Sequence, residues 1–518
     1  MSDLIVKNLN FGQRAQNQVF KGIDKLTQAV SSTLGASGKC VLLEDDNGKP
    51  IITKDGVTVA NSIVLLDPVE NMGATLLKEA ARKTVNEAGD GTTTATILAH
   101  AILKEVRETD LKVSARELKD GINSATKKAI NYLEENSIPV KGNMIDNIAT
   151  ISTNNDPELG KIIGDAFRAV GKTGVVMMDY SPKSETEVEL VDGIQYDKGT
   201  LNANFITNQE KKSCELDNPV VLLIESPVNN IRQIQSVLEY VIKEKKSLLI
   251  IADVEPPVMA TLAMNKQKGN IKVNIINAPT YGVNKREQLD DLSMLTGATV
   301  INEDLGDDMD LIQPEMLGTC LKSTTTEKDT VIQVGEPSEE ILSIITQIKD
   351  EIADGPLPSK LVGLEKRLAR LSAKIAIVKV GADSDIELKE KSDRIEDAIC
   401  ATKAAIKEGI VSGGGIALLN AALDIKEENE SEKILTKAIL SPFKTILDNA
   451  GIEVKIPSKK GTGINVVTGK KVNMIKSGII DPLLVTKSAL KNAVSVATTI
   501  LSTDCVINNL RHNEGDRK

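Results

Sequence analysis

A turn rich in glycine and threonine is the short segment of the chain with the clearest chemical potential. It reads Ala88-Gly89-Asp90-Gly91-Thr92-Thr93-Thr94 and directly precedes an amphipathic stretch. The glycines would let the backbone approach a ligand closely, and the threonine hydroxyls and the free N–H groups of a helix start can donate hydrogen bonds to phosphate oxygens. Asp90 offers a carboxylate of the kind that Mg²⁺ takes together with phosphate oxygens. The alternative is an ordinary threonine-capped helix after a glycine turn, and the spacing alone does not decide between the two.

A second glycine-containing segment could also surround phosphate. It covers residues 33–39, reads TLGASGK, and stands between a predicted helix and a predicted strand. It lacks the GxxxxGK(S/T) spacing of a P-loop, as does the rest of the chain. A glycine that ends the preceding helix is the simpler explanation of Gly35.

Two further places could supply charge for phosphate chemistry. Lys54 and Asp55 follow a predicted hairpin, where the lysine could neutralise phosphate charge and the aspartate could hold a metal ion or a water molecule. Asp397 comes two residues after Ile395 in a predicted helix, about 200° around the axis from the apolar stripe. A carboxylate on a rigid helix can orient or deprotonate a water molecule that attacks phosphorus. Taken alone, each place is more simply a solvated turn or a solvated helix acid.

Size and composition narrow the class of protein. The 518 residues exceed the size of a single hydrophobic core and predict two or three domains. The chain has 63 Lys and Arg against 73 Asp and Glu, a net charge of −10, which argues against a nucleic-acid partner because such proteins need a basic surface. The two histidines are far apart and no two of the five cysteines are closely spaced, which argues against the common zinc and redox motifs.

No targeting or membrane segment is apparent in the sequence. The N-terminus lacks the charged-then-apolar pattern of a signal peptide. The longest apolar runs, such as Val220–Ile224, are far shorter than the roughly 20 residues that a membrane span needs. Scattered, unpaired cysteines are typical of a reducing compartment. We therefore expect a cytoplasmic protein with no membrane partner.

The periodicity of apolar residues predicts a helical protein with an inserted α/β region. Helical spacing is found at 17–33, 72–86, 94–107 and 115–134, and two short strand-like runs at 39–43 and 51–53 predict a hairpin. Residues 190–375 alternate between apolar strands and helices, which is typical of a parallel sheet covered by helices on both faces. Helices are expected again at 394–408 and 416–423 and onward to about residue 503, with a frayed tail from Asn508. The predicted fold class is multidomain α plus α/β.

Seven segments in the same order resemble those of the group I chaperonins of the GroEL type. They are TLGASGK, ITKDGVTVA, ENMGA, AGDGTTTATILA, RIEDAICATKAAIKEG, SGGGIALL and GIIDPLLVTKSAL. The resemblance extends from about residue 10 to residue 507, which is nearly the whole chain. It implies a GroEL-like fold with a helical equatorial domain (1–136 and 409–518), a small intermediate domain (137–192 and 374–408) and an inserted α/β apical domain that binds clients (193–373).

The resemblance also implies an activity. The protein would be an ATP-dependent molecular chaperone that forms a ring-shaped cage, captures unfolded proteins and promotes their folding through ATP binding and hydrolysis. Its partners would be unfolded client proteins and further copies of the chain in a homo-oligomeric, heptameric ring, with a GroES-like co-chaperonin as a further candidate. ATP and Mg²⁺ are the implied cofactors, and K⁺ is a candidate second cation.

Matching motifs assign roles to individual residues. Asp397 would position the hydrolytic water with Asp55 close to it, and Asp90 would carry Mg²⁺. Motion about hinges near Pro139 and Gly409, and near Gly193 and residues 373–374, would couple ATP to domain closure. The client-binding positions are Phe205, Leu238, Met259, Ala263 and Met264. The nucleotide-binding positions are Thr33, Leu34, Gly35, Ala36, Lys54, Asp90, Gly91, Thr92, Thr93, Thr94, Gly414, Asn465, Val466, Val467 and Asp481.

The sequence departs from the family pattern at places that bear on function. The family's TLGPKG loop lacks its proline and lysine here, which should loosen it and weaken nucleotide binding. The Gly-Gly pair of the upper hinge is Ala373-Lys374, which should restrict its motion. Family aromatics are replaced by Thr200 and Asn204, and a family leucine is replaced by Gln235, so client binding should be weaker or narrower.

Two other functions stay open at this stage. One is an ATP-using metabolic enzyme with a small substrate in the α/β domain, although residues 190–375 contain no second group of catalytic residues. The other is a scaffold that binds nucleotide but has lost folding activity, which the departures from the family pattern leave open.

Overall fold

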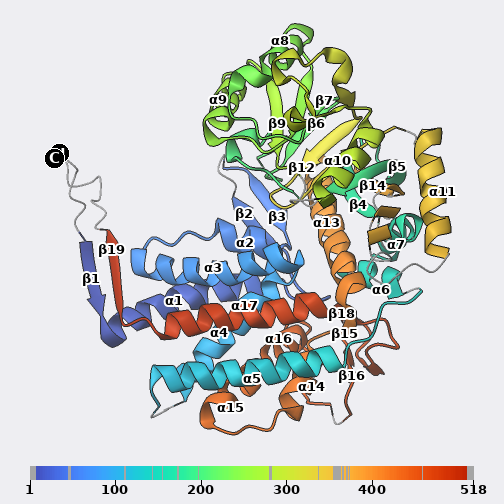
Figure 1. Ribbon diagram of the computed structural model, residues 1–518. Helices are drawn as coiled ribbons and strands as arrows, with labels where there is room; N and C mark the ends of the chain where they lie inside the picture. The colour runs from blue at the N-terminus through green and yellow to red at the C-terminus, as the bar shows by residue number, and fades with distance from the viewer. Residues whose placement is uncertain are drawn as a thin grey trace. The chain divides into compact units, whose positions relative to one another are not determined.

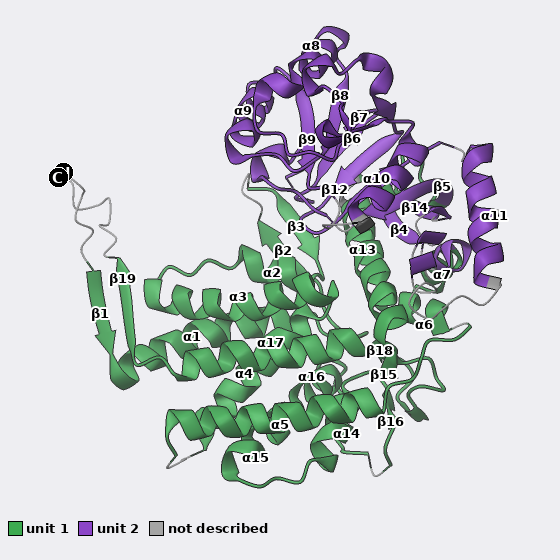
Figure 2. Ribbon diagram, in the orientation of Figure 1, with its two compact units in different colours: residues 1–165, 178–187, 379–518 green, residues 166–177, 188–378 purple. Residues whose placement is uncertain are grey.

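A computed structural model describes most of the chain as two compact units (Figures 1 and 2). The described residues are 7–44, 48–109, 113–142, 144–153, 156–171, 174–196, 198–209, 211–278, 283–335, 338–353, 363–364, 367–368, 371–372, 374–457 and 459–509. Unit 1 contains residues 1–165, 178–187 and 379–518, and unit 2 contains residues 166–177 and 188–378. Among the described residues, no helix has the length and apolar character that crossing a bilayer requires.

Unit 1 is built around five long helices, as the periodicity predicts. Each buries one apolar stripe in a shared core that includes Ile23, Leu77, Leu98 and Ile122. Local signals set the ends: Asp67 caps the helix that begins at Pro68, and Ser114 forms a capping box with Glu117. The five are α1 (Gly12–Ser31), α3 (Pro68–Ala88), α4 (Thr92–Glu108), α5 (Ala115–Glu135) and α17 (Leu483–Leu501).

One more long helix and several shorter elements complete unit 1. The predicted hairpin is present as the antiparallel pair β2 (Val41–Glu44) and β3 (Pro50–Thr53). The long helix α13 (Asp385–Glu408) ends at Gly409, which has a φ of +91°. The others are α2 (Gly56–Ser62), α6 (Met144–Ser152), β15 (Ile410–Ser412), α14 (Ile416–Asp424), α15 (Glu430–Ala438), α16 (Ser441–Asn449) and β18 (Ile480–Pro482), which pairs with β15.

Two expectations about the C-terminal part of the chain are wrong. Helices do not continue from 424 to 503, because β16 (Thr462–Asn465) and β17 (Lys470–Asn473) form a hairpin whose turn contains Gly469 at a φ of +69°. The predicted frayed tail is also wrong at its first two residues, since β19 (Cys505–Asn509) pairs with β1 (Lys7–Phe11), and the rest of that tail lies outside the described residues. Strand pairing between the two ends of a chain leaves no local sequence signal.

Unit 2 contains the predicted parallel sheet. Its order is β10-β7-β8-β9, and β11 (Gly318–Thr319) pairs antiparallel with β7. The parallel strands are β7 (Val220–Ile224), β8 (Ser247–Ile251), β9 (Lys272–Ile276) and β10 (Val300–Ile301). Val220, Leu222 and Ile224 lie in one core with residues of α8 (Gln235–Glu244) and α9 (Pro256–Gln267).

The other face of this sheet is covered differently from what the sequence predicts. Val221 and Leu223 share a core with Ile194 and Ile332, which belong to a second sheet, and with Leu289 of α10 (Val283–Thr296). Helices therefore contact both faces, as expected, but α10 shares this face with a second sheet that the sequence did not predict. Some of its strands, such as β12 (Lys322–Thr325), are short and polar and carry no apolar run that could reveal them. This six-stranded sheet has the order β4 (Val175–Tyr180), β14 (Lys374–Val380), β5 (Glu187–Tyr196), β13 (Thr330–Gln333), β12 and β6 (Cys214–Asp217).

Two further helices are α7 (Pro157–Val170) and α11 (Glu339–Ala353). At the positions matched to the upper hinge, Ala373 lies outside the described residues and Lys374 is the first residue of β14. Gly193 is packed tightly in β5, because a Cβ there would lie 2.2 Å from Cδ1 of Ile375.

Candidate functional site

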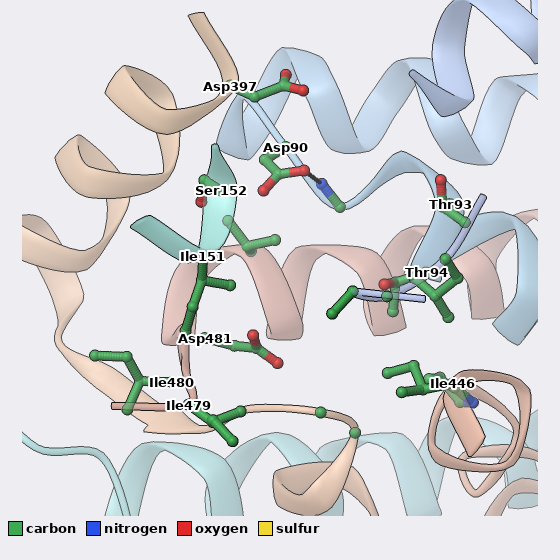
Figure 3. Close-up of a pocket in the computed structure, with 18 of the residues that line it drawn as sticks. Asp90, Thr93, Thr94, Ile151, Ser152, Asp397, Ile446, Ile479, Ile480 and Asp481 are labelled. Carbon is green, nitrogen blue, oxygen red and sulfur yellow. Dashed lines mark hydrogen bonds between the residues drawn. The ribbon is translucent and has the colours of Figure 1, made fainter. Parts of the chain in front are cut away.

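A cavity of about 570 Å³ in unit 1 brings the predicted residues together. Ligand pockets commonly have volumes of roughly 300–1,000 Å³. Figure 3 shows side chains from α13, from the turn after α3 and from β18 around one open space. Every residue that the sequence assigned to nucleotide binding or to hydrolysis lines this cavity: Thr33, Leu34, Gly35, Ala36, Lys54, Asp55, Asp90, Gly91, Thr92, Thr93, Thr94, Asp397, Gly414, Asn465, Val466, Val467 and Asp481.

The turn between α3 and α4 places uncapped backbone N–H groups at the cavity. Gly91 is the N-cap of α4, with a φ of +90°, and no side chain caps the helix. The sequence alternative of an ordinary threonine-capped helix is therefore wrong. A Cβ on Gly91 would lie 2.7 Å from Cγ1 of Val485, so only glycine fits here. An uncapped helix start with a positive dipole end is suited to bind an anionic group.

Lys54 and Asp55, which directly follow the β2–β3 hairpin, line the same cavity. The Asp55 carboxylate accepts hydrogen bonds from the N–H groups of Val57 and Thr58, at 3.1 and 2.7 Å, and so caps α2. A Cβ on Gly56 would lie only 2.2 Å from Oγ1 of Thr93, so the hairpin end packs directly on the threonine turn. Asp55 is thus fixed by the fold and is not a residue of a solvated turn.

The loop after α1 differs in detail from its prediction. The helix ends at Ser31 with Ser32 as its C-cap, so Gly35 does not end the helix. Gly35 has a φ of +86°, a conformation that favours glycine. The N–H of Gly38 donates to the carbonyl of Gly35 at 2.9 Å, and the N–H of Lys39 donates to the carbonyl of Ser32 at 2.8 Å. These bonds close the loop at the cavity wall.

Carboxylates concentrate around the cavity and perturb one another. Burial, followed by the charges of Asp90 and Asp55, holds the pKa of Asp397 well above its usual range. Burial also raises the pKa of Asp90, against the effect of a hydrogen bond from the N–H of Gly91. The pKa of Asp481 rises to about 7 through burial and then the charge of Asp90, and the pKa of Asp393 rises to about 6 through burial and then the charge of Asp55. Burial and the charges of neighbouring carboxylates therefore both disfavour the ionised forms of these side chains.

The donor set fits a magnesium ion that is shared with phosphate. Among the described residues, no three His, Cys, Asp or Glu side chains are grouped to hold a metal ion by themselves. Mg²⁺ is commonly bound by one or two carboxylates and completes its octahedron with phosphate oxygens and water. Asp90, with its raised pKa and its place beside the helix start, fits such a ligand.

The raised pKa of Asp481 predicts a pH-dependent stability. Its folded pKa of about 7 exceeds the unfolded value of 3.8, so the native state holds the proton more tightly and stability falls as the pH rises toward 7. The effect is at most about 4 kcal/mol. We expect Asp481→Asn to raise the melting temperature of the nucleotide-free protein by a few degrees at pH 8 and to change it little at pH 4. Calorimetry at both pH values checks this, and an equal shift at both would contradict it.

The structure adds cavity residues that the sequence analysis missed. Glu390, Asp393 and Arg394 line the cavity from α13, and they lie seven, four and three residues before Asp397. Helical spacing from Asp397 could have found them. The other additions include Asn147, Thr150, Ile151 and Ser152 of α6 and Phe443 and Ile446 of α16, for which the sequence carries no local signal.

The residues assigned to client binding belong to unit 2, and none of them lines this cavity. Phe205 and Ala263 are 0% and 2% exposed and belong to the core between the parallel sheet and its helices. The expectation that these two face a client is therefore corrected by their burial. Leu238 and Met259 are half-buried against the same core, and Met264 is 56% exposed. The accessible part of the predicted surface is thus formed by Leu238, Met259 and Met264.

Asn204, which stands where the family has an aromatic residue, is held by polar contacts. Lys266 donates from Nζ to the carbonyls of Asn204 and Ile206, both at 3.0 Å, and Gln267 donates from Nε2 to Oδ1 of Asn204 at 2.7 Å. The segment that contains Asn204 is therefore tied to the end of α9 by hydrogen bonds.

Comparison with known proteins identifies the family. The sequence model of the TCP-1/cpn60 chaperonin family matches residues 26–511, so the chain belongs to this family. It is a chaperonin, a chaperone that assists protein folding in an ATP-dependent way.

Solved structures agree with the fold. A crystal structure of the chaperonin gp146 from the Pseudomonas aeruginosa bacteriophage EL, in the presence of ATP-BeFx, is 21% identical in sequence and superimposes with a TM-score of 0.73, covering 97% of this chain and 99% of that chain. A second crystal form of gp146 gives a TM-score of 0.65 with the same identity and coverage. The fold is therefore GroEL-like, with helical and α/β parts.

Proposed function

We propose that the cavity of unit 1 binds ATP with Mg²⁺ and hydrolyses it, and that this hydrolysis drives a ring-shaped folding cage. The observation that carries the proposal is that Asp397 of α13 and the glycine–threonine turn of Asp90 to Thr94 line one cavity (Figure 3). A triphosphate bound at the turn would place its terminal phosphate among the carboxylate side chains near Asp397. The presence of ATP-BeFx in the gp146 crystals is consistent with a nucleotide site in this fold.

Each part of the cavity has a chemical task in this proposal. The N–H groups at the start of α4 and the hydroxyls of Thr92, Thr93 and Thr94 would donate to phosphate oxygens. Asp90 would hold Mg²⁺, which when bound neutralises phosphate charge and polarises the phosphoryl group. The loop of Thr33 to Ala36 and the residues Gly414, Asn465, Val466, Val467 and Asp481 would surround the rest of the nucleotide. K⁺ remains a candidate second cation.

The hydrolytic step is assigned to Asp397. Its raised pKa makes its carboxylate a stronger base than an exposed aspartate, so it can orient a water molecule and accept its proton. Asp55 is fixed near it by the cap of α2 and adds negative charge, which raises that basicity further. Lys54 would offset part of the phosphate charge.

The proposal is tested by steady-state ATP hydrolysis of the purified chain together with electron-microscopic particle images, each with and without ATP. The expected result is magnesium-dependent hydrolysis and ring-shaped particles whose shape changes with ATP. Absence of hydrolysis in the presence of rings would favour a scaffold, and hydrolysis by monomers alone would favour an unrelated ATP-using enzyme.

Two small ribbons of unit 1 support assembly into a ring. In the β1–β19 ribbon, Leu9 lies directly opposite Ile507, and these residues are 51% and 52% exposed. In the β2–β3 ribbon, Leu42 lies opposite Ile52, and these are 68% and 54% exposed. An isolated two-stranded ribbon is marginally stable, and its free edges invite further strands. Contact between the ribbons of neighbouring copies would be head-to-tail and would generate a ring.

We therefore expect the double variant Leu9→Lys/Ile507→Lys to lose ring assembly, because paired charges replace the apolar face of one ribbon. Sedimentation velocity and particle images check this. The matched control is Leu305→Lys/Leu311→Lys, which changes exposed leucines of unit 2 in the same way. Intact rings in the first variant would contradict the role of the ribbons.

The finer features of the machine also remain proposals. They are the three-domain division, heptameric symmetry, isomerase-like promotion of folding, a GroES-like co-chaperonin and a cytoplasmic location. Client proteins would bind at Leu238, Met259 and Met264, whose apolar and adaptable side chains suit promiscuous contact with unfolded chains.

A further inference from the structure

The amide of Asn449 links two parts of the cavity wall that are far apart in the sequence. Asn449 is the last residue of α16, and its Nδ2 donates to the carbonyls of Ser31 and Leu34, both at 2.9 Å. Because carbonyl oxygens only accept, the two hydrogens of the amide nitrogen are both used, and the orientation of the amide is defined.

The two carbonyls belong to the end of α1 and to the loop that follows it. Ser31 is the last residue of α1, and the terminal carbonyls of a helix have no partner inside the helix. Leu34 is part of the cavity wall. The carbonyl of Ser31 also accepts a hydrogen bond from the backbone N–H of Leu34 at 3.2 Å. Asn449 adds a second bond at this helix end and holds the first part of the loop with the same side chain.

The loop depends on such bonds for its shape. Residues 33–39 contain no proline, so no ring restricts the backbone. The loop also packs on α16, since a Cβ on Gly35 would lie 3.3 Å from two side-chain carbons of Ile446. Ile446 lines the cavity in its turn (Figure 3). One helix thus supports the loop through Asn449 and contacts the cavity directly through Ile446.

We propose that Asn449 is a positioning residue for the nucleotide, which fixes the loop of Thr33 to Ala36 in its binding geometry. This role rests on the proposed function of the cavity. The carbonyl contacts replace the rigidity that a proline would give, so their loss releases the loop and raises the entropy that binding must remove. Asn449 does not line the cavity, so replacing it leaves the side chains that act in the hydrolytic step, such as Asp397, in place.

The test compares Asn449→Ala and Asn449→Asp with the wild type and with Asp448→Ala, an exposed neighbour on the same helix. Alanine removes the donors, and aspartate places an acceptor against two carbonyls. We expect the Kd for ATP, and the KM for hydrolysis, to rise roughly tenfold in both variants while kcat stays within about twofold. Hydrogen exchange of the nucleotide-free protein should become faster for residues 33–39 in these variants and stay unchanged in Asp448→Ala.

Three results would overturn the role. The first is wild-type Kd and KM in both variants. The second is a loss of kcat and of melting temperature together with affinity, which would indicate general destabilisation. The third is a wild-type protein that binds no nucleotide, which contradicts the proposed function and this role with it, whereas the first two contradict this role alone.

Discussion

Replacing Asp397 by asparagine is expected to lower kcat for ATP hydrolysis by roughly 10²–10⁴-fold, the usual contribution of a positioned general base. The amide keeps the shape of the side chain but cannot accept the proton of the attacking water. Because burial and the charges of Asp90 and Asp55 already disfavour the ionised carboxylate, the neutral residue should not destabilise the protein and should leave ATP binding intact or strengthen it.

Single-turnover hydrolysis and equilibrium binding of ATP measure the two effects separately. Glu396→Gln is the matched control, because Glu396 is the exposed neighbour of Asp397 on α13 and does not line the cavity. A variant at Asp397 that hydrolyses ATP at the wild-type rate would remove this residue from the mechanism. A variant that loses binding as well would indicate that Asp397 supports the nucleotide and not the water.

The second large effect is expected on client capture. The double variant Leu238→Ser/Met264→Ser should weaken the binding of an unfolded protein by roughly ten- to a hundredfold, because both side chains would bury apolar surface against the client. Both residues lie at the surface of unit 2, and Met264 has no part in the folded core. ATP hydrolysis without a client should therefore stay at the wild-type level.

Suppression of the aggregation of a denatured client, measured without and with ATP, checks this expectation. The control Leu305→Ser/Leu311→Ser removes leucines of the same unit that are 65% and 62% exposed but lie outside the predicted surface. Equal protection by the two double variants would show that these helices do not capture clients. The burial of Phe205 and Ala263 makes this surface smaller than the sequence suggests, so its few accessible residues should each matter more.

Asn204, which replaces an aromatic residue of the family, changes more in unit 2 than the amount of exposed apolar surface. Asn204 is tied to Lys266 and Gln267 by hydrogen bonds, which hold its segment against α9. An aromatic side chain could not accept the hydrogen bond that Gln267 donates to Oδ1. The polar residue therefore reduces apolar surface and also fixes the segment, and we expect both effects to narrow the range of clients.

Local patterns along the chain were enough to predict the long helices of unit 1 and the parallel strands of unit 2, and the resemblance to a known family added many of the residues at the cavity. Apolar periodicity and apolar runs are local properties, and the glycines of the turn at Asp90 mark backbone conformations that other residues avoid. Motifs distributed along the chain specified the residues of the cavity wall from Thr33 to Asp481, all of which the fold brings together. Net charge, cysteine spacing and the shortness of the apolar runs argued against a nucleic-acid-binding protein, the common zinc and redox motifs and a membrane-spanning protein, and none of these arguments needed a contact between residues.

Contacts between distant segments, in contrast, follow from the folded chain alone. The second sheet of unit 2, the β1–β19 ribbon and the bonds from Asn449 to Ser31 and Leu34 all depend on partners far away in the chain, which no local pattern specifies. Whether an apolar side chain is exposed also depends on the folded chain, because a residue such as Phe205 could belong to a core or to a binding surface with the same local sequence. The raised pKa values of Asp397 and Asp481 come from burial and from neighbouring charges, which exist only when folding brings these carboxylates to one cavity.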